Sequence, residues 1–188
     1  MSWMDQIGNI LQQYSGASAQ AAPDQVQDDF DRFAESAPPS AVADGLAAAF
    51  RSEETPPFPS MVSQLFGQSD GQQRAGILNT LIRTLGPTDV AHILRRRAGG
   101  GGGGGGGIGD LLGGLLGGSG QPQVTPDVAQ QIPPDAVEEI AQQAEQRDPS
   151  VVDMISNVYA QHPQLVKTLG AAALTIALAK IAQRQQGG

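Results

Sequence analysis

The stretch Ala98–Gly120 reads AGGGGGGGGGIGDLLGGLLGGSG and divides the chain. Nine glycines run unbroken over residues 99–107. A glycine-rich segment behaves as a flexible coil with a root-mean-square span of about 5–6 Å times √n, or roughly 15–18 Å for this run. We therefore expect an N-terminal helical domain at 1–98, a poly-Gly linker at 99–107 and a C-terminal helical module at 121–188.

The glycine run does not have the pattern of a phosphate-binding loop. Such a loop follows a strand, spaces its glycines and continues with Lys and Ser or Thr at the start of a helix. Here no strand pattern precedes the glycines, and the first charged residue after them is Asp110. The sequence therefore predicts no nucleotide site and no cofactor.

Residues 108–120 form a second element, a Gly/Leu segment with an amphipathic pattern. Its large apolar residues follow the i, i+3, i+4, i+7, i+8 spacing of one helix face: Ile108, Leu111, Leu112, Leu115 and Leu116. Each interior glycine costs a helix about 1 kcal/mol relative to alanine. We therefore expect a conditional helix that forms only against a partner, a membrane or the protein's own domains.

The residues before the glycines have helical periodicity and no convincing strand run. We expect five or six helices there, beginning near Ser2, Asp24, Ser40, Ser60 and Asp70 as capping residues and followed by a short helix from Thr88. The Gly86-Pro87 pair should end the helix that begins at Asp70. The fold class is all-α.

The rear module repeats a helix-start pattern. PDAVEEI begins at Pro134, PSVVDMI at Pro149 and PQLVKTL at Pro163. Because proline is favoured in the first helical turn, each proline should begin a short helix. We expect three or four such helices, with another start at Thr125-Pro126 and Asp148 as an N-cap.

The last helix, expected over 165–183, is apolar around most of its circumference. Its lysines enclose only twelve uncharged residues, fewer than the roughly 20 that a membrane span needs. Two interpretations stay open: the buried central helix of the rear module, or a helix that docks on a membrane surface or another copy. Under the second interpretation, this helix extends the docking surface of the Gly/Leu segment by six residues: Leu165, Leu169, Leu174, Ile176, Leu178 and Ile181.

The net charge of −8 is unevenly distributed. Residues 1–70 carry −8, residues 71–98 carry +4, residues 99–161 carry −7 and residues 162–188 carry +3. An acidic chain with two short basic segments argues against extensive nucleic-acid binding. The candidate basic contacts, to an anionic surface or partner, are Arg95, Arg96, Arg97, Lys167, Lys180 and Arg184.

The residues that usually carry chemistry are scarce. Cysteine is absent, which excludes disulfides and thiolate ligands, and the two histidines are not in a metal-ligand pattern. No basic leader opens the chain, so we expect a cytoplasmic protein that can also lie peripheral to a membrane. The sequence predicts no catalytic, cofactor-binding or metal-binding residue and no small-molecule substrate.

These patterns favour a non-enzymatic helical interaction or assembly protein. Its expected partner is a protein or a second copy, and an anionic membrane surface is a further candidate. A first alternative is a membrane-active protein, toxin-like or pore-associated, that inserts its Gly/Leu segment and last helix. A second is a DNA-binding helix-turn-helix over residues 71–97. Nucleic acid is the less favoured partner because Asp89 would repel phosphate in the first turn of the second helix.

Overall fold

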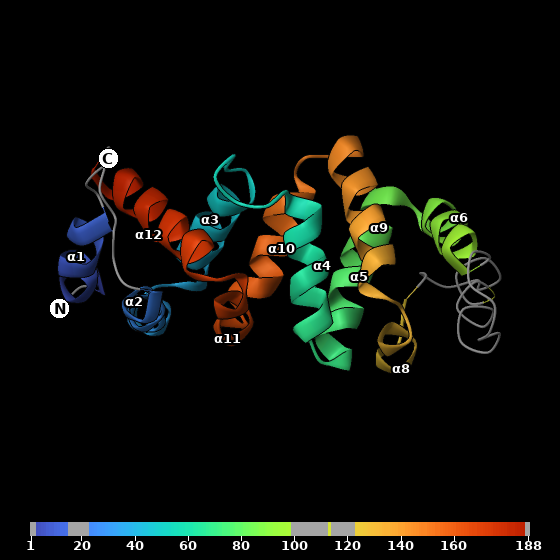
Figure 1. Ribbon diagram of the computed structural model, residues 1–188, viewed down its shortest axis with the longest axis horizontal. Coiled ribbons are helices and arrows are strands. Elements are labelled where there is room, and N and C mark those ends of the chain that lie inside the picture. The colour runs from blue at the N-terminus through green and yellow to red at the C-terminus, as the bar shows by residue number, and fades with distance from the viewer. Residues whose placement is uncertain (1–2, 15–22, 99–112, 114–122, 187–188) are drawn as a thin grey trace. The chain divides into compact units, whose positions relative to one another are not determined.

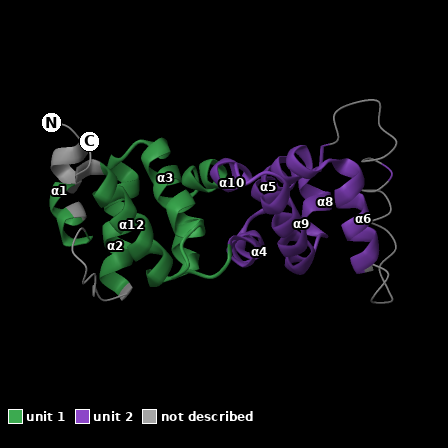
Figure 2. Ribbon diagram, turned by 90° about the horizontal axis from the view of Figure 1, so that it is seen from above, with its two compact units in different colours: residues 1–57, 156–188 green, residues 58–155 purple. Residues whose placement is uncertain are grey.

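The computed structural model describes residues 3–14, 23–98, 113 and 123–186, and within these ranges the fold is all-α with no strand. Figure 1 shows the helices in chain order. They group into two compact units (Figure 2). Unit 1 contains residues 1–57 and 156–188, and unit 2 contains residues 58–155.

The units do not follow the division expected from the sequence. The expected front domain at 1–98 contributes helices to both units, and so does the expected rear module at 121–188. The physical reason is burial: a short amphipathic helix covers its apolar face only against other helices, and here those helices come from the other side of the glycines. The linker at 99–107 and the segment at 108–120 lie outside the described residues, apart from Gly113.

Unit 1 is built around its C-terminal helix, α12 (Ala171–Gln186). This helix packs most extensively on α3 (Pro39–Phe50) and also contacts α1 (Trp3–Tyr14) and α2 (Pro23–Ser36). The α3–α12 approach is close, because a Cβ atom at Gly45 would lie 2.9 Å from Ile181 Cγ1 and 3.1 Å from the Ala177 carbonyl oxygen. Glycine at position 45 therefore lets the two helices approach.

Unit 2 combines α4 (Phe58–Gln68), α5 (Gly71–Leu85) and α6 (Pro87–Ala98) with α8 (Pro126–Gln130) and α9 (Pro134–Arg147). The most extensive packing is between α4 and α9. Fully buried aliphatic and aromatic side chains from both sides of the glycines fill its core: Val62, Leu65, Phe66, Ile77, Leu78, Leu81, Ala136, Val137 and Ile140. The unit boundary falls within α10 (Val151–Ala160).

Most of the expected helix starts are confirmed to within a few residues. Asp70 caps α5 in a full capping box, with Gln73 bonded back to the Asp70 amide. Pro126 and Pro134 occupy first-turn positions. Ser40 is not a cap, because α3 begins one residue earlier and its N-cap is Pro38.

The start of α10 differs from the expected one. The helix begins at Val151, and Asp148 accepts a hydrogen bond from the Ser150 amide at 3.0 Å instead of occupying the N-cap itself. Hydrogen bonds from the Ser150 side chain and then from its backbone amide lower the pKa of the exposed Asp148 carboxyl group.

The expected single helix over 165–183 is wrong. The chain forms α11 (Pro163–Val166) and a 3-10 turn, η1 (Lys167–Leu169), and then breaks at Gly170 before α12 begins. Gly170 has φ 91° and ψ 166°, and Gly86 between α5 and α6 has φ 95° and ψ 150°. Both conformations strongly favour glycine, so each Leu-Gly pair ends one helix and lets the next begin in a new direction.

Candidate interaction site

The C-terminal residues expected to form a docking surface divide by burial. Leu174, Leu178 and Ile181 belong to the core of unit 1, with exposures of 0%, 0% and 4%. They face the helices that α12 packs against, so they are not surface residues, which corrects that part of the expectation. Leu165, Leu169 and Ile176 are half-buried. The five residues Ile108, Leu111, Leu112, Leu115 and Leu116 lie outside the described residues.

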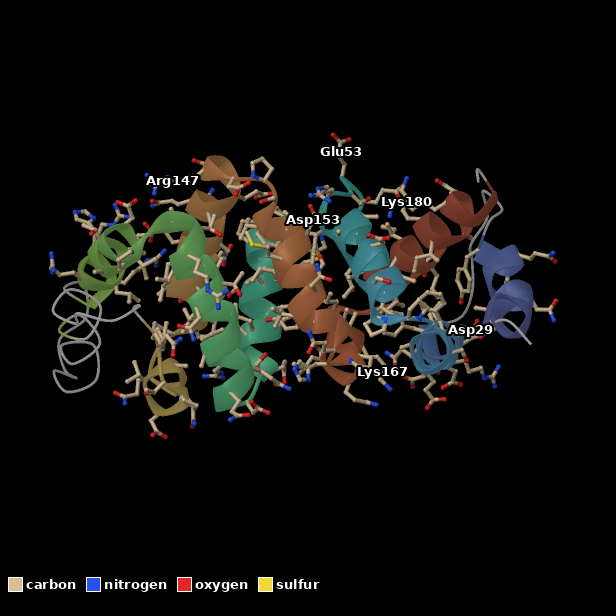
Figure 3. All side chains as sticks on the ribbon, turned by 180° about the vertical axis from the view of Figure 1, so that it is seen from behind. Asp29, Glu53, Arg147, Asp153, Lys167 and Lys180 are labelled. Carbon is tan, nitrogen blue, oxygen red and sulfur yellow. The ribbon has the colours of Figure 1, made fainter. Side chains whose placement is uncertain are left out.

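The basic C-terminal segment pairs with the protein's own acidic N-terminal region. Lys167 Nζ lies 2.7 Å from Asp31 Oδ2 on α2, and an Arg184 guanidinium nitrogen lies 2.8 Å from Asp44 Oδ2 on α3. Lys180 is exposed on α12 (Figure 3). Two of the three candidate basic contacts in this C-terminal segment therefore pair with carboxylates within unit 1.

The arginines at the end of α6 have a similar internal partner. Arg97 Nε lies 2.8 Å from Glu139 Oε2 on α9, and Arg96 pairs with Glu139 Oε1. Arg95 is exposed. Because one carboxylate holds two of the three guanidinium groups, the charge available to an external anion is smaller than the sequence suggests.

Helices α6 and α9 are joined by ion pairs near both ends of α6. At the other end, an Arg147 guanidinium nitrogen lies 2.7 Å from Asp89 Oδ2 and also donates to the Leu85 carbonyl oxygen. Residues 89 and 97 and residues 139 and 147 have the same eight-residue separation, about 12 Å of helix at 1.5 Å per residue. The two helices are thus antiparallel, with opposite charges facing at both positions.

A polar cleft of about 670 Å³ opens beside the Arg147 end of this pair. Its lining consists of three α9 amides, the Asp89–Arg147 pair and one leucine: Gln142, Gln143, Gln146, Asp89, Arg147 and Leu85. Figure 3 marks Arg147 at the end of α9. This cleft could not be predicted from the sequence, because nothing in the local pattern of α9 indicates that α6 lies beside it.

The chain enters and leaves the 99–122 stretch from the same unit. On the entering side, Arg96 and Arg97 attach the end of α6 to α9. On the leaving side, Asn79 of α5 bonds both backbone groups of Val124: its Oδ1 accepts from the Val124 amide at 2.7 Å, and its Nδ2 donates to the Val124 carbonyl at 3.3 Å. The glycine stretch therefore does not connect unit 1 to unit 2.

Arg74 is a further attachment in unit 2 that the sequence analysis did not identify. Its guanidinium group lies over the Phe66 ring, 5.0 Å from the centroid, and donates to the Gly67 and Ser69 carbonyls at the end of α4. It also reaches the Gln130 carbonyl of α8 at 3.4 Å. A positive group at these carbonyls compensates the unbonded C-terminal end of a helix.

In unit 1, the buried titratable pair is Tyr14 and Asp29. The Tyr14 hydroxyl is at the end of α1 and donates to Asp29 Oδ2 on α2 at 2.9 Å. Burial, followed by the hydrogen bond and the charge of Asp29, raises the pKa of Tyr14 well above its ordinary value. The pair therefore attaches α1 to α2.

Within the described ranges, no three His, Asp or Glu side chains come together in a group that could hold a metal ion. No single described helix is long and apolar enough to cross a membrane, although Pro163–Leu169 and Ala171–Arg184, bent by 116°, pass that test as a pair. The chain matches no protein-family model, and no curated protein or solved structure is detectably similar to it.

Proposed function

We propose that this chain is a non-enzymatic helical interaction and assembly protein that presents its Gly/Leu segment from unit 2. One observation carries the proposal: the 99–122 stretch is attached to unit 2 at both of its ends, before it through Arg97 and after it through Val124. A stretch that leaves and re-enters the same unit is not needed as a spacer between units. Its regularly spaced leucines therefore need another role, and contact with a partner is the simplest.

The burial pattern favours assembly over membrane insertion. Insertion of α12 would uncover the apolar faces of the helices it packs against, including Val42 and Leu46 of α3, which are buried in unit 1. Each large apolar side chain left in water would cost about 1.5–3 kcal/mol. Peripheral contact with an anionic surface through the Gly/Leu segment needs no such opening. The membrane-active alternative is therefore less favoured than reversible association.

The DNA-binding alternative is also less favoured. A helix-turn-helix joins its helices through a turn of three or four residues, whereas α5 and α6 are separated by Gly86 alone. Asp89 in the first turn of α6 is paired with Arg147, and two of the arginines at its far end are paired with Glu139. The face that would read bases therefore has little free positive charge.

The test replaces Leu111, Leu112, Leu115 and Leu116 with Ser in the full chain. The matched control replaces alternate glycines of 99–107 with Ser and keeps the leucines. Sedimentation equilibrium and flotation with anionic vesicles, both started from the monomer fraction of each protein, should show association in the wild type and the control, and its loss in the leucine variant. Equal association in all three proteins, or none in any, would overturn the proposal, and vesicle leakage would favour the membrane-active alternative instead.

A further inference from the structure

Residues 1–98 and 123–186 are two complementary halves of the chain, and each compact unit is made from one part of both. From this arrangement we propose that the partner of each half can be a second copy of this chain. Chains that fold together would exchange their C-terminal halves and form a dimer with the same contacts as the monomer. This inference does not depend on the Gly/Leu segment binding anything.

In unit 1, the contacts that join the halves are charged at the edge and apolar in the centre. The N-terminal half supplies Asp31 and Asp44, and the C-terminal half supplies Lys167 and Arg184. Between them α12 covers the buried face of α3, where Val42 and Leu46 are 2% and 1% exposed. Without the C-terminal half, this face of α3 would lose its principal cover.

In unit 2, the halves meet through two copies of the same motif. Pro59–Leu65 in α4 reads PSMVSQL and 134–140 in α9 reads PDAVEEI, both with proline first, valine fourth and a large aliphatic residue seventh. The Ser60 hydroxyl donates to Glu138 Oε1 at 2.8 Å, and the Ser63 hydroxyl donates to the Pro134 carbonyl at 3.0 Å.

These two bonds are nearly reciprocal. Ser60, the second residue of the α4 motif, bonds to Glu138, the fifth residue of the α9 motif. Ser63, the fifth residue of the α4 motif, bonds to Pro134, the first residue of the α9 motif. Such pairing is typical of two equivalent helices related by a local two-fold axis, the arrangement by which identical subunits recognise each other. The α4–α9 interface thus resembles a subunit interface contained within one chain.

The charges reinforce the same pairing. In the described part of the chain, the Arg32–Asp29 pair lies within one half, whereas the pairs of Glu139, Arg147, Lys167 and Arg184 all cross between halves. The peptide connection between the halves is the 24-residue stretch 99–122, and its sequence predicts a coil in the nine-glycine run. The contacts therefore depend on the sequences of the two halves. An N-terminal half can make them with the C-terminal half of its own chain or with that of a second copy.

Concentration should decide between the two arrangements. A flexible connector holds two partners at an effective concentration of about 1 mM. Chains refolded well below that concentration should close on themselves, and the ratio of exchanged dimer to monomer should rise about tenfold for each tenfold increase in concentration. The dimer should persist after dilution, because reversing the exchange requires both units to open.

The experiment uses two full-length chains, one with Ser60→Cys and the other with Glu138→Cys. The natural chain has no cysteine, so these are the only thiols. The chains are mixed in denaturant, refolded at low and at high concentration, and treated with a short thiol-to-thiol cross-linker. Exchange predicts a cross-link between the two different chains that increases with the concentration during refolding, since only α4 of one chain against α9 of the other brings these thiols together.

The control mixes the same two chains after each has folded alone, and it should give no such cross-link. A second measurement avoids the substitutions: two wild-type chains with different affinity tags should co-purify as dimers after joint refolding at high concentration. The leucine-to-serine variant of the Gly/Leu segment should exchange as the wild type does. Monomer alone at every refolding concentration, with no cross-link between chains, would overturn the inference.

Discussion

Leu178 tests whether α12 is a core helix or a docking helix. Its side chain is fully buried in unit 1, and α12 packs there against α1, α2 and α3. Replacing a buried leucine with alanine removes its transfer free energy and leaves a cavity, at a cost of about 2–5 kcal/mol. A large part of the stability of a domain, about 5–15 kcal/mol in total, would be lost. We therefore expect Leu178→Ala to destabilise unit 1 strongly.

Lys180→Ala is the matched control, because it removes a long side chain from an exposed position on the same helix. It should change the free energy of unfolding by no more than about 0.5 kcal/mol. The two tyrosines of the chain, Tyr14 and Tyr159, are both buried in unit 1, so their near-ultraviolet absorbance during urea unfolding reports on unit 1. With a urea dependence of about 1–3 kcal/mol/M, Leu178→Ala should lower the midpoint by about 1–2 M.

The reasoning would be refuted if Leu178→Ala unfolded at the same urea concentration as Lys180→Ala. That result would mean that α12 contributes little to the core and is free to dock elsewhere. Loss of vesicle binding in Leu178→Ala without loss of stability would point the same way.

Three further changes test other parts of the structure. Asn79→Ala removes both hydrogen bonds to Val124 and should cost about 1–3 kcal/mol; hydrogen exchange at Val124 should increase, and unchanged exchange would contradict the attachment. The raised pKa of Tyr14 means that the folded state favours the neutral phenol, so the stability from this group is complete below pH 10 and is lost as the pH rises above it. Chemical unfolding of Tyr14→Phe should show a smaller alkaline loss than the wild type, and parallel curves would refute the assignment. Gly170→Ala should destabilise by about 1–3 kcal/mol because of its positive φ, whereas Gly76→Ala in the open face of α5 should be neutral or stabilising; equal midpoints would contradict this.

The local signals in the sequence predicted much of the secondary structure. The capping box at Asp70 and the proline at position 134 depend on neighbouring backbone groups, so their effect can be read from a few adjacent residues. The error at Gly170 shows the limit of apolar periodicity. The pattern over 165–183 continues through the glycine, and only the backbone conformation shows that the helix stops.

The candidate site was less predictable than the helices. The basic residues were identified correctly by type, but the acidic partners of Arg97 and Lys167 lie 42 and 136 positions away. No local pattern relates residues at such separations. For the same reason the cleft beside Arg147 and the bonds of Asn79 to Val124 became visible only in the folded chain.

The sequence by itself determined that the described part of the chain is all-α and where most of its helices begin. Those properties follow from backbone conformation and capping, which act over one or two turns. Only the tertiary structure decided that the halves on either side of the glycines share both compact units. Burial of apolar surface is non-directional. The pattern of an amphipathic helix therefore shows that its apolar face must be covered, but not by which helix. Shape and charge across the assembled interface select that helix.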